Sequence, residues 1–418
     1  MQLTARDRAM LEGAEGPAPQ LAMSILVRMA EIGGAPGLMD ISQAHIDSTI
    51  YLGDATLEFA ERLAALGARV AVPTSLNVSG VDVCGWQRWA VPPEWAAKAA
   101  RQMRAYEQMG AVATWTCAPY HTHMRPAFGQ QIAWGESNAI AFANSVIGAR
   151  TERYPDLLDV CCAITGRVPA VGLHLTENRA GQALLQLVDV PRPLQADDQF
   201  FAVLGHLVGQ LAGDAIPVID GIVTRPVEDQ LKAFAAAAAS SGRVALFHLV
   251  GITPEAPTLD AAFQGRRPRA TIDITVPALK AARAELTNAD GADLDMVILG
   301  SPHFSLDEFR RLAPLVAGQR RHPRVKLLVT SGRAMKEQAE QAGVLAPVLE
   351  FGAEITLDTC VLASPMLPPD IKRLMTNSAK YAYYAPSLLA ARITFGSLAD
   401  CVRSAIEGRV VRDDSTWQ

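Results

Sequence analysis

The sequence predicts an α/β protein in which mostly parallel sheets are flanked by helices, in two or three packed subdomains. An amphipathic segment that ends at a glycine recurs along the chain, and a short apolar run follows each glycine. The chain has 418 residues, of which 50% are hydrophobic. Because a single hydrophobic core rarely grows to that length, the length itself indicates more than one subdomain.

The clearest of these units predicts a helix over residues 55–66, its end at Gly67 and a strand over residues 68–73. The same pattern recurs around Gly110 and Gly352. Glycine adopts the left-handed conformation that ends a helix at little cost, and the next strand then begins. Later segments such as "DLDMVILG" and "RVKLLVTS" continue the alternation. Alternating helices and apolar strands favour parallel sheets with helices on both faces.

The middle of the chain has a different pattern. Residues 172–191 and 215–223 resemble a strand-rich insert with helices between the strands. We therefore expect an α/β subdomain over residues 1–170, which contains Cys117 and Cys161. A mixed α/β insert over residues 171–290 and an α/β subdomain over residues 291–418, which contains Cys360, follow it.

Composition argues against several classes of function. The net charge is −5 and no stripe of Lys and Arg is present, so we expect no nucleic-acid partner and no membrane surface. No export signal and no long uncharged apolar run are visible, so we expect a cytoplasmic protein without a membrane-spanning helix. The six cysteines lack the regular spacing of a small disulfide-bonded domain and are expected to be thiols or metal ligands.

Three cysteine positions are candidates for a shared cofactor site. Cys117 and Cys360 each follow a glycine–strand unit, and ligands bind beyond the carboxyl ends of strands in such folds. The pair Cys161 and Cys162 in "DVCCAITGR" is the third candidate. Thiolates from separate loops are typical of a cofactor held between elements, with iron–sulfur clusters or zinc as the expected metals.

A local alternative uses Cys117 with His121 and His123. Their C-x-x-x-H-x-H spacing would suit the zinc site of a hydrolase if the segment were extended, but Pro119 and Pro126 favour a loop. Cys84 and Cys401 are expected to be ordinary small hydrophobic residues.

Eight sequence blocks occur in a recognisable order between residues 40 and 386. They are "DISQAHIDSTIY", "VPTSLNVSGVD", "TWTCAPY", "GQQIAWGESNAIAFANSVIGARTER", "AITGRVPAVGLHL", "GSPHFSLDEF", "TLDTCVLASP" and "NSAKYAYYAP". Together they resemble the large subunit, or catalytic domain, of the aconitase X family. Because the resemblance extends over nearly the whole chain, it is far more specific than any single motif.

The resemblance implies an aconitase-like architecture and an iron–sulfur-dependent hydro-lyase, with the nuclearity of the cluster left open. It also implies three cysteine ligands, which correspond to Cys117, Cys161 and Cys360, with Cys162 as the alternative to Cys161. Family members act with a small swivelling domain that carries a reactive serine. Since no "GRGS"-type stretch occurs here, we expect a separate small subunit, a heterodimer, and a general base supplied by that subunit.

Two substrates are associated with the family. One is cis-3-hydroxy-L-proline, which is dehydrated to a pyrroline-2-carboxylate, and the other is mevalonate 5-phosphate. A phosphate requires a basic or glycine-rich cradle, and none of the candidates Arg125, Arg150, Arg167, Arg333 and Lys380 lies in a P-loop. We therefore favour hydroxyproline, with mevalonate 5-phosphate as the alternative. A zinc hydrolase or a non-catalytic binding chain is the alternative of another class.

The substrate carboxylate and hydroxyl group need polar partners near strand ends and helix starts. Ser137 and Asn138 precede an apolar helix, where they serve equally well as helix caps. His303 follows a strand and precedes "SLDE", which predicts a capping box at Ser305. The candidate substrate-binding residues are Ser42, His45, Thr74, Asn77, Glu136, Ser137, Asn138, His303 and Lys380.

Overall fold

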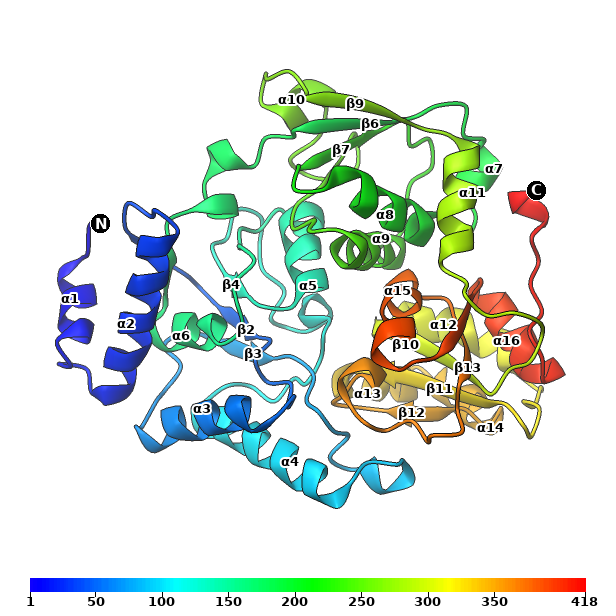
Figure 1. Cartoon of the computed structure of the whole chain (residues 1–418), viewed down its shortest axis with the longest axis horizontal. Helices are drawn as coiled ribbons and strands as arrows, with labels where there is room; N and C mark the ends of the chain where they lie inside the picture. Colours follow the sequence, from blue (N-terminus) through cyan, green and yellow to red (C-terminus); the bar gives the residue numbers. More distant parts are fainter.

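The computed structural model describes residues 1–418, and its elements form three groups around separate sheets (Figure 1). Every strand pair is parallel except β1 with β5. Helices flank the sheets. The α/β class with mostly parallel sheets is therefore confirmed.

The first group contains a three-stranded sheet of order β3-β2-β4 and a small β1-β5 ladder. Helices α2 and α6 pack on one another beside β2, while α3 and α4 form a second helical pair. The bounds are α1 Ala5–Leu11, α2 Pro17–Ile32, β1 Leu38–Asp40, β2 Ala44–Ile46, α3 Asp54–Ala65, β3 Thr74–Leu76, η1 Trp86–Arg88, α4 Pro93–Gln108, η2 Pro119–His121, β4 Ala133–Trp134, α5 Ser137–Phe142, the π-helical turn η3 Ala143–Ile147, α6 Leu158–Thr165, β5 Arg167–Pro169, η4 Gly172–His174 and η5 Thr176–Asn178.

The glycines end the helices as expected, but the first two strands do not follow them directly. Gly67 and Gly110 have φ of 79° and 91°. Residues 68–73 are irregular because the backbone N–H groups of Val70 and Ala71 bond to carbonyls at helix ends instead of to a strand. The strand β3 begins only at Thr74. After Gly110 the chain runs beside β3 with a single bridge, from Val112 to Ser75.

The second group is a four-stranded parallel sheet of order β8-β7-β6-β9. Helices α8 and α9 pack together between this sheet and the rest of the molecule, and α9 also contacts α5 and α15 (Figure 1). The bounds are β6 Ala183–Leu187, α7 Arg192–Gln195, α8 Phe200–Ala212, β7 Pro217–Asp220, α9 Glu228–Ser241, β8 His248–Leu249, α10 Leu259–Phe263, β9 Ala270–Ile274 and α11 Val276–Glu285.

The third group is a five-stranded parallel sheet of order β12-β11-β10-β13-β14 with helices on both faces. Here the pattern around Gly352 is confirmed, since β12 begins two residues after this glycine. The bounds are β10 Met296–Phe304, α12 Leu306–Val316, β11 Lys326–Ser331, α13 Arg333–Gln341, α14 Leu345–Glu350, β12 Glu354–Thr356, η6 Val361–Ala363, β13 Arg373–Thr376, α15 Ala379–Leu388, β14 Arg392–Phe395, α16 Leu398–Glu407 and η7 Ser415–Trp417.

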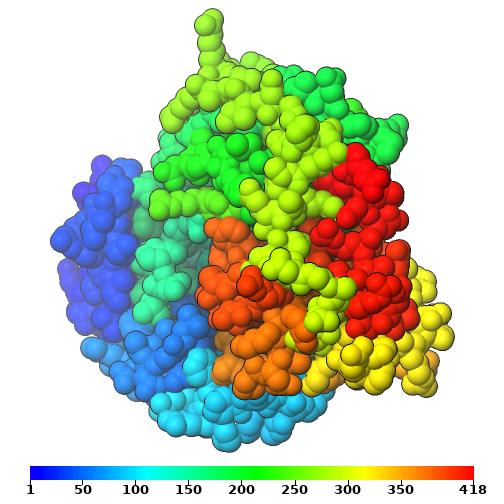
Figure 2. Space-filling view, turned by 45° about the vertical axis from the view of Figure 1, so that its right-hand side comes forward, coloured from blue at the N-terminus to red at the C-terminus, as the bar shows by residue number.

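The carboxyl ends of β10, β12 and β13 share one edge of the third sheet because these strands are parallel. The loop after β12 meets the first group there, where the Ser79 N–H donates to the Asp358 carbonyl at 2.6 Å. Figure 2 shows the three groups as blocks of colour in contact, blue to teal, green, and yellow to red. The sorting of the four sheets into three groups supports the division near residues 170 and 290, which we keep as a proposal. No helix combines the length and apolar composition that crossing a membrane requires.

Arg179 links the first two groups, and its replacement by methionine is expected to destabilise the chain by about 3–5 kcal/mol. The guanidinium is fully buried and donates to both Glu255 carboxylate oxygens, to Oε1 at 3.1 Å and to Oε2 at 2.9 and 2.5 Å. It also donates to the Leu173 carbonyl at 2.9 Å. Methionine would leave these acceptors without a donor. Urea unfolding measures the loss, and R243M is the matched control because the Arg243–Asp214 pair is exposed and should contribute less than about 0.5 kcal/mol.

Candidate functional site

A pocket of about 300 Å³ lies where the first and third groups meet. Its polar lining comes from segments far apart in the sequence. The side chains are those of Asn77, which follows β3, Cys117, Glu136, which caps α5, Ser301 of β10, Cys360, which follows β12, and Lys380 of α15. Aliphatic side chains surround this polar floor. The pocket therefore combines a large apolar wall with a few convergent polar groups, which is typical of a small-molecule site.

Lys380 and Glu136 form a buried ion pair in this pocket. The distance between Nζ and Oε1 is 2.6 Å, and the exposed fractions of the two side chains are 14% and 7%. Burial acts against the charged form of Lys380, but the Glu136 carboxylate more than offsets it and raises the pKa of the ammonium. Burial likewise opposes ionisation of Glu136, but Lys380 and an N–H bond from Asn138 lower its pKa. The pocket therefore holds one cation and one anion at neutral pH.

Cys117 and Cys360 line the same pocket from opposite groups. Cys117 is 7% exposed and accepts a hydrogen bond from the backbone N–H of His303 at 3.3 Å, while Cys360 is half-buried. Burial raises the pKa of the Cys117 thiol to about 12, and the nearby Lys380 ammonium acts in the opposite direction. A thiol beside a cation is readily converted to the thiolate when a metal replaces its proton.

His303 forms hydrogen bonds to both cysteine loops. It lies behind the pocket and is not part of its lining. It is 1% exposed. Its Nε2 is 3.0 Å from the Thr359 carbonyl, and its Nδ1 is 3.1 Å from Thr116 Oγ1. Because a carbonyl only accepts, Nε2 carries the proton and Nδ1 accepts from the Thr116 hydroxyl. Thr116 and Thr359 directly precede Cys117 and Cys360, so one imidazole sets the positions of both loops.

The variant H303A is expected to lose about 2–4 kcal/mol of stability, because two buried polar groups lose their partner and a cavity forms. The separation of the two loops should also become variable, so that Cys360 reacts faster with a thiol reagent. Chemical denaturation and the rate of thiol modification measure the two effects. H303Q is the matched control, since its amide offers one N–H donor for the Thr359 carbonyl. Equal Cys360 reactivity in H303A and the unmodified chain would contradict this role.

The structure does not bring Cys161 or Cys162 to this pocket. Both lie on α6, whose eight residues are all buried, and both side chains are 0% exposed within the main hydrophobic core. Burial raises the pKa of Cys161 to about 12. No group of three or more His, Cys, Asp or Glu side chains is placed to hold a metal ion anywhere in the chain. These two cysteines therefore pack as small apolar residues.

Among the predicted substrate-binding residues, Asn77, Glu136 and Lys380 line the pocket and the others do not. Asn138 lies directly behind it, where its amide donates to the Cys117 carbonyl at 3.1 Å and to Glu136. Ser137 is the first residue of α5, while Glu136, not Ser137 or Asn138, is the cap. The capping box at Ser305 is confirmed.

Three more of these residues lie away from the pocket. Ser42 is exposed and bonds to the Gln131 carbonyl, while the hydroxyl of buried Thr74 bonds to the carbonyl of Val72. His45 is fully buried, with Nδ1 2.8 Å from Ser75 Oγ. Each of these side chains makes its hydrogen bond within the first group.

The local zinc alternative does not form either. His121 turns toward Glu228, with Nε2 3.8 Å from Oε1, and lines a different surface pocket. His123 is exposed. The 3-10 turn η2 at Pro119–His121 bends the segment, so Cys117 and the histidines do not share a face. This agrees with the loop that the two prolines predict.

Sequence reasoning missed several pocket residues. Ser301 stands two positions before His303 in "GSPHF", but a lone serine carries little signal. Tyr384 and Leu388 follow Lys380 at i+4 and i+8 on α15 and line the same pocket. Helical spacing would have identified them once α15 was known to run from residue 379.

A second set of buried polar side chains adjoins the pocket. Asp47 is held by Asn77 and lies near Asp159, which accepts from the Asp47 backbone N–H at 2.6 Å. Burial and the neighbouring carboxylates of Glu136 and Asp159 raise the pKa of Asp47 well above its usual range. The shift favours the protonated form of Asp47, because its carboxylate would add a second negative charge beside Glu136.

The chain is expected to lose stability as the pH falls from about 6.5 toward 4. Burial lowers the pKa of His45 and of His174 to about 3. Both imidazoles stay neutral in the folded state but take up a proton in the unfolded state below their ordinary pKa of 6.5. The stability that these two neutral imidazoles contribute to the folded chain is therefore fully present above pH 6.5 and is lost as the pH falls. Melting temperatures recorded across this pH range test whether stability falls with pH. A melting temperature that does not change with pH would contradict the prediction.

Comparison with known proteins places the whole chain in one family. The aconitase X first domain matches residues 1–177, the second domain residues 181–284 and the third domain residues 294–407. The cis-3-hydroxy-L-proline dehydratase of Pseudomonas aeruginosa is 49% identical over 100% of this chain and 72% of that protein. The enzyme of the same name from Hypocrea jecorina is 45% identical over 98% of this chain and 69% of that protein.

More distant relatives carry another name. The phosphomevalonate dehydratase large subunit of Methanothermobacter thermautotrophicus is 36% identical over 95% of this chain and 97% of that protein. The crystal structure of Thermococcus kodakaraensis aconitase X in its holo-form superimposes with a TM-score of 0.87 at 32% identity, covering 97% of this chain and 100% of that one. The names cis-3-hydroxy-L-proline dehydratase and phosphomevalonate dehydratase both denote dehydratases, which are hydro-lyases. The resemblance in the eight sequence blocks is confirmed, and the chain belongs to the aconitase X family.

Proposed function

We propose that this chain dehydrates cis-3-hydroxy-L-proline to a pyrroline-2-carboxylate, with an iron–sulfur cluster at the Cys117–Cys360 pocket and with a small subunit or domain that completes the site. The two bacterial and fungal relatives with this name are 49% and 45% identical to it, whereas the archaeal phosphomevalonate dehydratase subunit is 36% identical.

The observation that carries the choice of substrate is the Lys380–Glu136 pair. Hydroxyproline is a zwitterion with a carboxylate and a ring ammonium group on adjacent atoms. The pocket offers one cation and one anion 2.6 Å apart, so each charge of the substrate has an opposite charge to face. The aliphatic side chains of Ile50, Leu52 and Leu388 line the remaining wall, where they suit the ring methylene groups.

A phosphate monoester lacks comparable partners in this pocket. Lys380 is the single basic side chain in its lining. The other arginines considered from the sequence already pair with carboxylates. Arg125 pairs with Glu228, Arg150 with Glu255, Arg167 with Asp7 and Arg333 with Asp358. Since a second negatively charged group would meet Glu136, the pocket favours a zwitterion over mevalonate 5-phosphate.

Dehydration removes the hydrogen at C2 and expels hydroxide from C3. Lys380 binds the carboxylate and withdraws electron density from C2, which makes that hydrogen more acidic. Glu136 orients the ring ammonium group and thereby fixes which face of the ring lies over the thiols. The aliphatic wall limits the access of water to the reacting atoms. The proton acceptor comes from the partner, where the family resemblance places a reactive serine.

The residues fit an iron–sulfur cluster in part. Cys117 and Cys360 are two thiols from separate strand-end loops beside a cation, which suits a thiolate-held cluster, but Cys161 and Cys162 do not supply the third. When bound, a cluster with an incompletely ligated iron supplies a Lewis acid for the leaving hydroxyl. Cys117 and Cys360 would hold it, and His303 keeps their loops in place.

Two features support a partner at the pocket mouth. Leu52 and Leu388 line the pocket yet are 64% and 59% exposed, so a partner protein could bury these apolar side chains in its interface. The chain also spans 72% and 69% of the length of its bacterial and fungal relatives, and the archaeal relatives are named large subunits. We infer that a small swivelling domain or subunit closes over this opening. The six free thiols suit a reducing, cytoplasmic environment.

The test is anaerobic co-expression with the small-subunit chain of the same genome, followed by an assay of water elimination. Turnover of cis-3-hydroxy-L-proline, without turnover of mevalonate 5-phosphate, is the expected result. The variant E136Q should raise KM for hydroxyproline, since the ring ammonium loses its partner. Turnover of mevalonate 5-phosphate alone would assign the other activity of the family, and colourless protein inactive on both substrates would reject the proposal.

A further inference from the structure

The end of β10 leaves the regular pairing of the third sheet where it reaches the pocket. The pairing of β10 with β11 shifts between Leu299 and Phe304, and its pairing with β13 ends at Val297. Ser301, which lines the pocket, lies in the stretch between these positions, and neither register gives it a partner residue. Contacts other than the strand ladder therefore have to fix this part of the pocket wall.

Side-chain hydroxyl groups bind two backbone carbonyls in this stretch. Thr330 Oγ1 donates to the Gly300 carbonyl at 2.5 Å, and the Ser378 hydroxyl donates to the Ser301 carbonyl. Thr330 belongs to the adjacent strand β11, whereas Ser378 lies outside the sheet and caps α15. The bond from Ser378 therefore ties the pocket end of β10 to a different element.

Ser378 joins two walls of the pocket through one hydroxyl group. Its Oγ accepts a hydrogen bond from the Tyr381 N–H at 3.0 Å, while its single proton goes to the Ser301 carbonyl. The first contact makes it the N-cap of α15. Lys380 follows two positions later and lines the pocket, with Tyr384 one helical turn further on. The hydroxyl therefore links Ser301 of one wall to the helix that carries Lys380.

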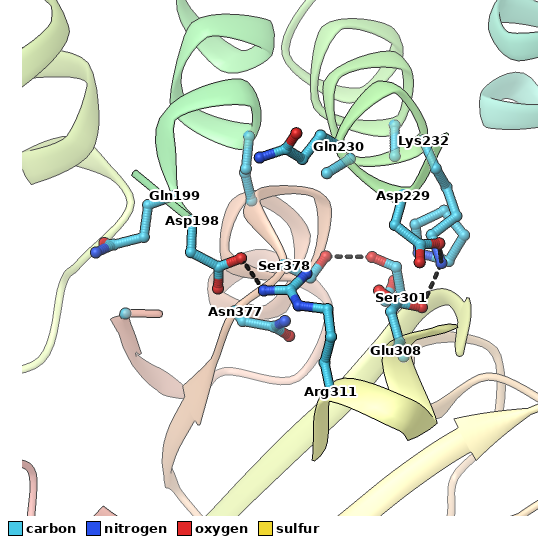
Figure 3. A pocket seen from close by; sticks show the side chains of 17 residues that line it. Asp198, Gln199, Asp229, Gln230, Lys232, Ser301, Glu308, Arg311, Asn377 and Ser378 are labelled. Atoms are coloured by element: carbon cyan, nitrogen blue, oxygen red, sulfur yellow. Dashed lines mark hydrogen bonds and ion pairs between the residues drawn. The ribbon is translucent and has the colours of Figure 1, made fainter. Parts of the chain in front are cut away.

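Packing leaves the start of α15 unsupported on one side. A polar cavity of about 50 Å³ lies against Asn377, Ser378 and Ala379, between α15, the end of β10 and the helices of the second group (Figure 3). A space of that size holds water molecules and no side chain. Because no close-packed neighbour fixes the first turn of α15 there, the bond from Ser378 to Ser301 is the contact that sets its distance from β10.

We propose that Ser378 is a positioning residue for the reaction, because its hydroxyl sets where Lys380 lies relative to Glu136 and Ser301. This inference rests on the proposed function, in which Lys380 binds the substrate carboxylate. Lys380 Nζ is 2.6 Å from Glu136 Oε1, a distance that a small shift of α15 would change. A misplacement of about 1 Å can cost about 100-fold in rate. Loss of the Ser378 hydroxyl should therefore weaken substrate binding although no group that touches the substrate is removed.

Ser397 offers a matched control, because it caps the next helix of the chain in the same way. Its Oγ accepts from the Asp400 N–H at 3.0 Å, and α16, like α15, has 10 residues. Ser397 does not belong to the pocket lining. Both S378A and S397A lose a helix cap, but only S378A also releases the Ser301 carbonyl.

The first measurement is the steady-state kinetics of hydroxyproline dehydration by the full chain with its small subunit, purified without oxygen. S378A is expected to lower kcat/KM by about tenfold, mainly by raising KM, while S397A stays within about twofold of wild type. Partial unfolding would lower kcat and leave KM unchanged, so a rise in KM separates positioning from loss of structure. S378T should restore KM, because threonine keeps the hydroxyl group and also caps helices.

The second measurement needs no substrate. On the same complex, the fall in melting temperature that E136Q causes reports how strongly Glu136 interacts with Lys380. This fall should be smaller in the S378A background than in wild type, because a displaced ammonium gains less from the carboxylate. It should be the same in the S397A background as in wild type, because distant and independent sites are additive.

Three outcomes would overturn the proposal. The first is an equal change of KM in S378A and S397A, and the second is a KM that S378T does not restore. The third is an E136Q effect of the same size in the wild-type and S378A backgrounds. A wild-type complex that does not turn over hydroxyproline rejects the proposed function instead. The melting temperatures then decide the role of Ser378, since a smaller E136Q effect in S378A supports it and an equal effect rejects it.

Discussion

Replacing Lys380 by methionine is expected to abolish substrate binding and to destabilise the chain, the largest combined effect of any single substitution in the pocket. Lys380 is 14% exposed and Glu136 7% exposed, and their charged atoms are 2.6 Å apart. Without the ammonium, the Glu136 carboxylate is left buried and uncompensated, which costs about 3–5 kcal/mol. The substrate carboxylate also loses its cation, so kcat/KM should fall by about 100-fold or more. Urea unfolding and steady-state kinetics measure the two effects.

A double variant separates the two consequences of losing Lys380. In K380M/E136Q no charge is left unpaired, so most of the lost stability should return. Activity should not return, because neither charge of the substrate then has a partner. The matched surface control is K336M, which removes an exposed partner of Glu340 and should change stability by less than about 0.5 kcal/mol. Recovery of full activity in the double variant would reject the role of the pair in binding.

Replacing Cys117 or Cys360 by alanine is expected to remove the cluster and all dehydratase activity. Both thiols line the pocket, and alanine offers no donor in their place. Because a cluster held through few protein ligands loses most of its affinity when one is removed, the iron bound should fall below about a tenth of the wild-type content. Visible absorbance and iron analysis of protein purified without oxygen measure the loss.

The controls for this result are cysteines outside the pocket. Cys84 is exposed and Cys401 is fully buried in the core of the third group. C84A should keep colour and activity, and C401A should keep its colour while it remains folded. If C117A and C360A both retain a wild-type spectrum, the cluster does not lie in this pocket.

Local patterns predicted much of the fold. The pattern around Gly352 is reproduced by α14 and β12, and "SLDE" is the capping box of α12. Both signals depend on residues within a few positions of each other. The strand predicted over residues 68–73 was wrong because its backbone groups bond to the ends of distant helices, at Met109 and Ala163. No local pattern contains those partners.

The pocket was predicted less completely, for a related reason. Asn77, Glu136 and Lys380 stand where strands end or helices begin, and such positions meet at one edge of a parallel sheet. Ser42 and Ser137 have the same kind of local setting but lie elsewhere. A polar residue at a strand end is a candidate for the site, but the packing of the three groups decides whether it reaches the pocket.

The sequence by itself determined the α/β class, the family and the loops that carry the chemistry, because helix periodicity, glycine stops and ordered sequence blocks are properties of neighbouring residues. Only the tertiary structure decided which cysteines meet. Cys117 and Cys360 converge because β10, packed between the two loops, holds both through His303. Cys161 and Cys162 turn into the core because α6 is buried on every side, and a helix without an exposed face carries no pattern that tells a ligand from a packing residue.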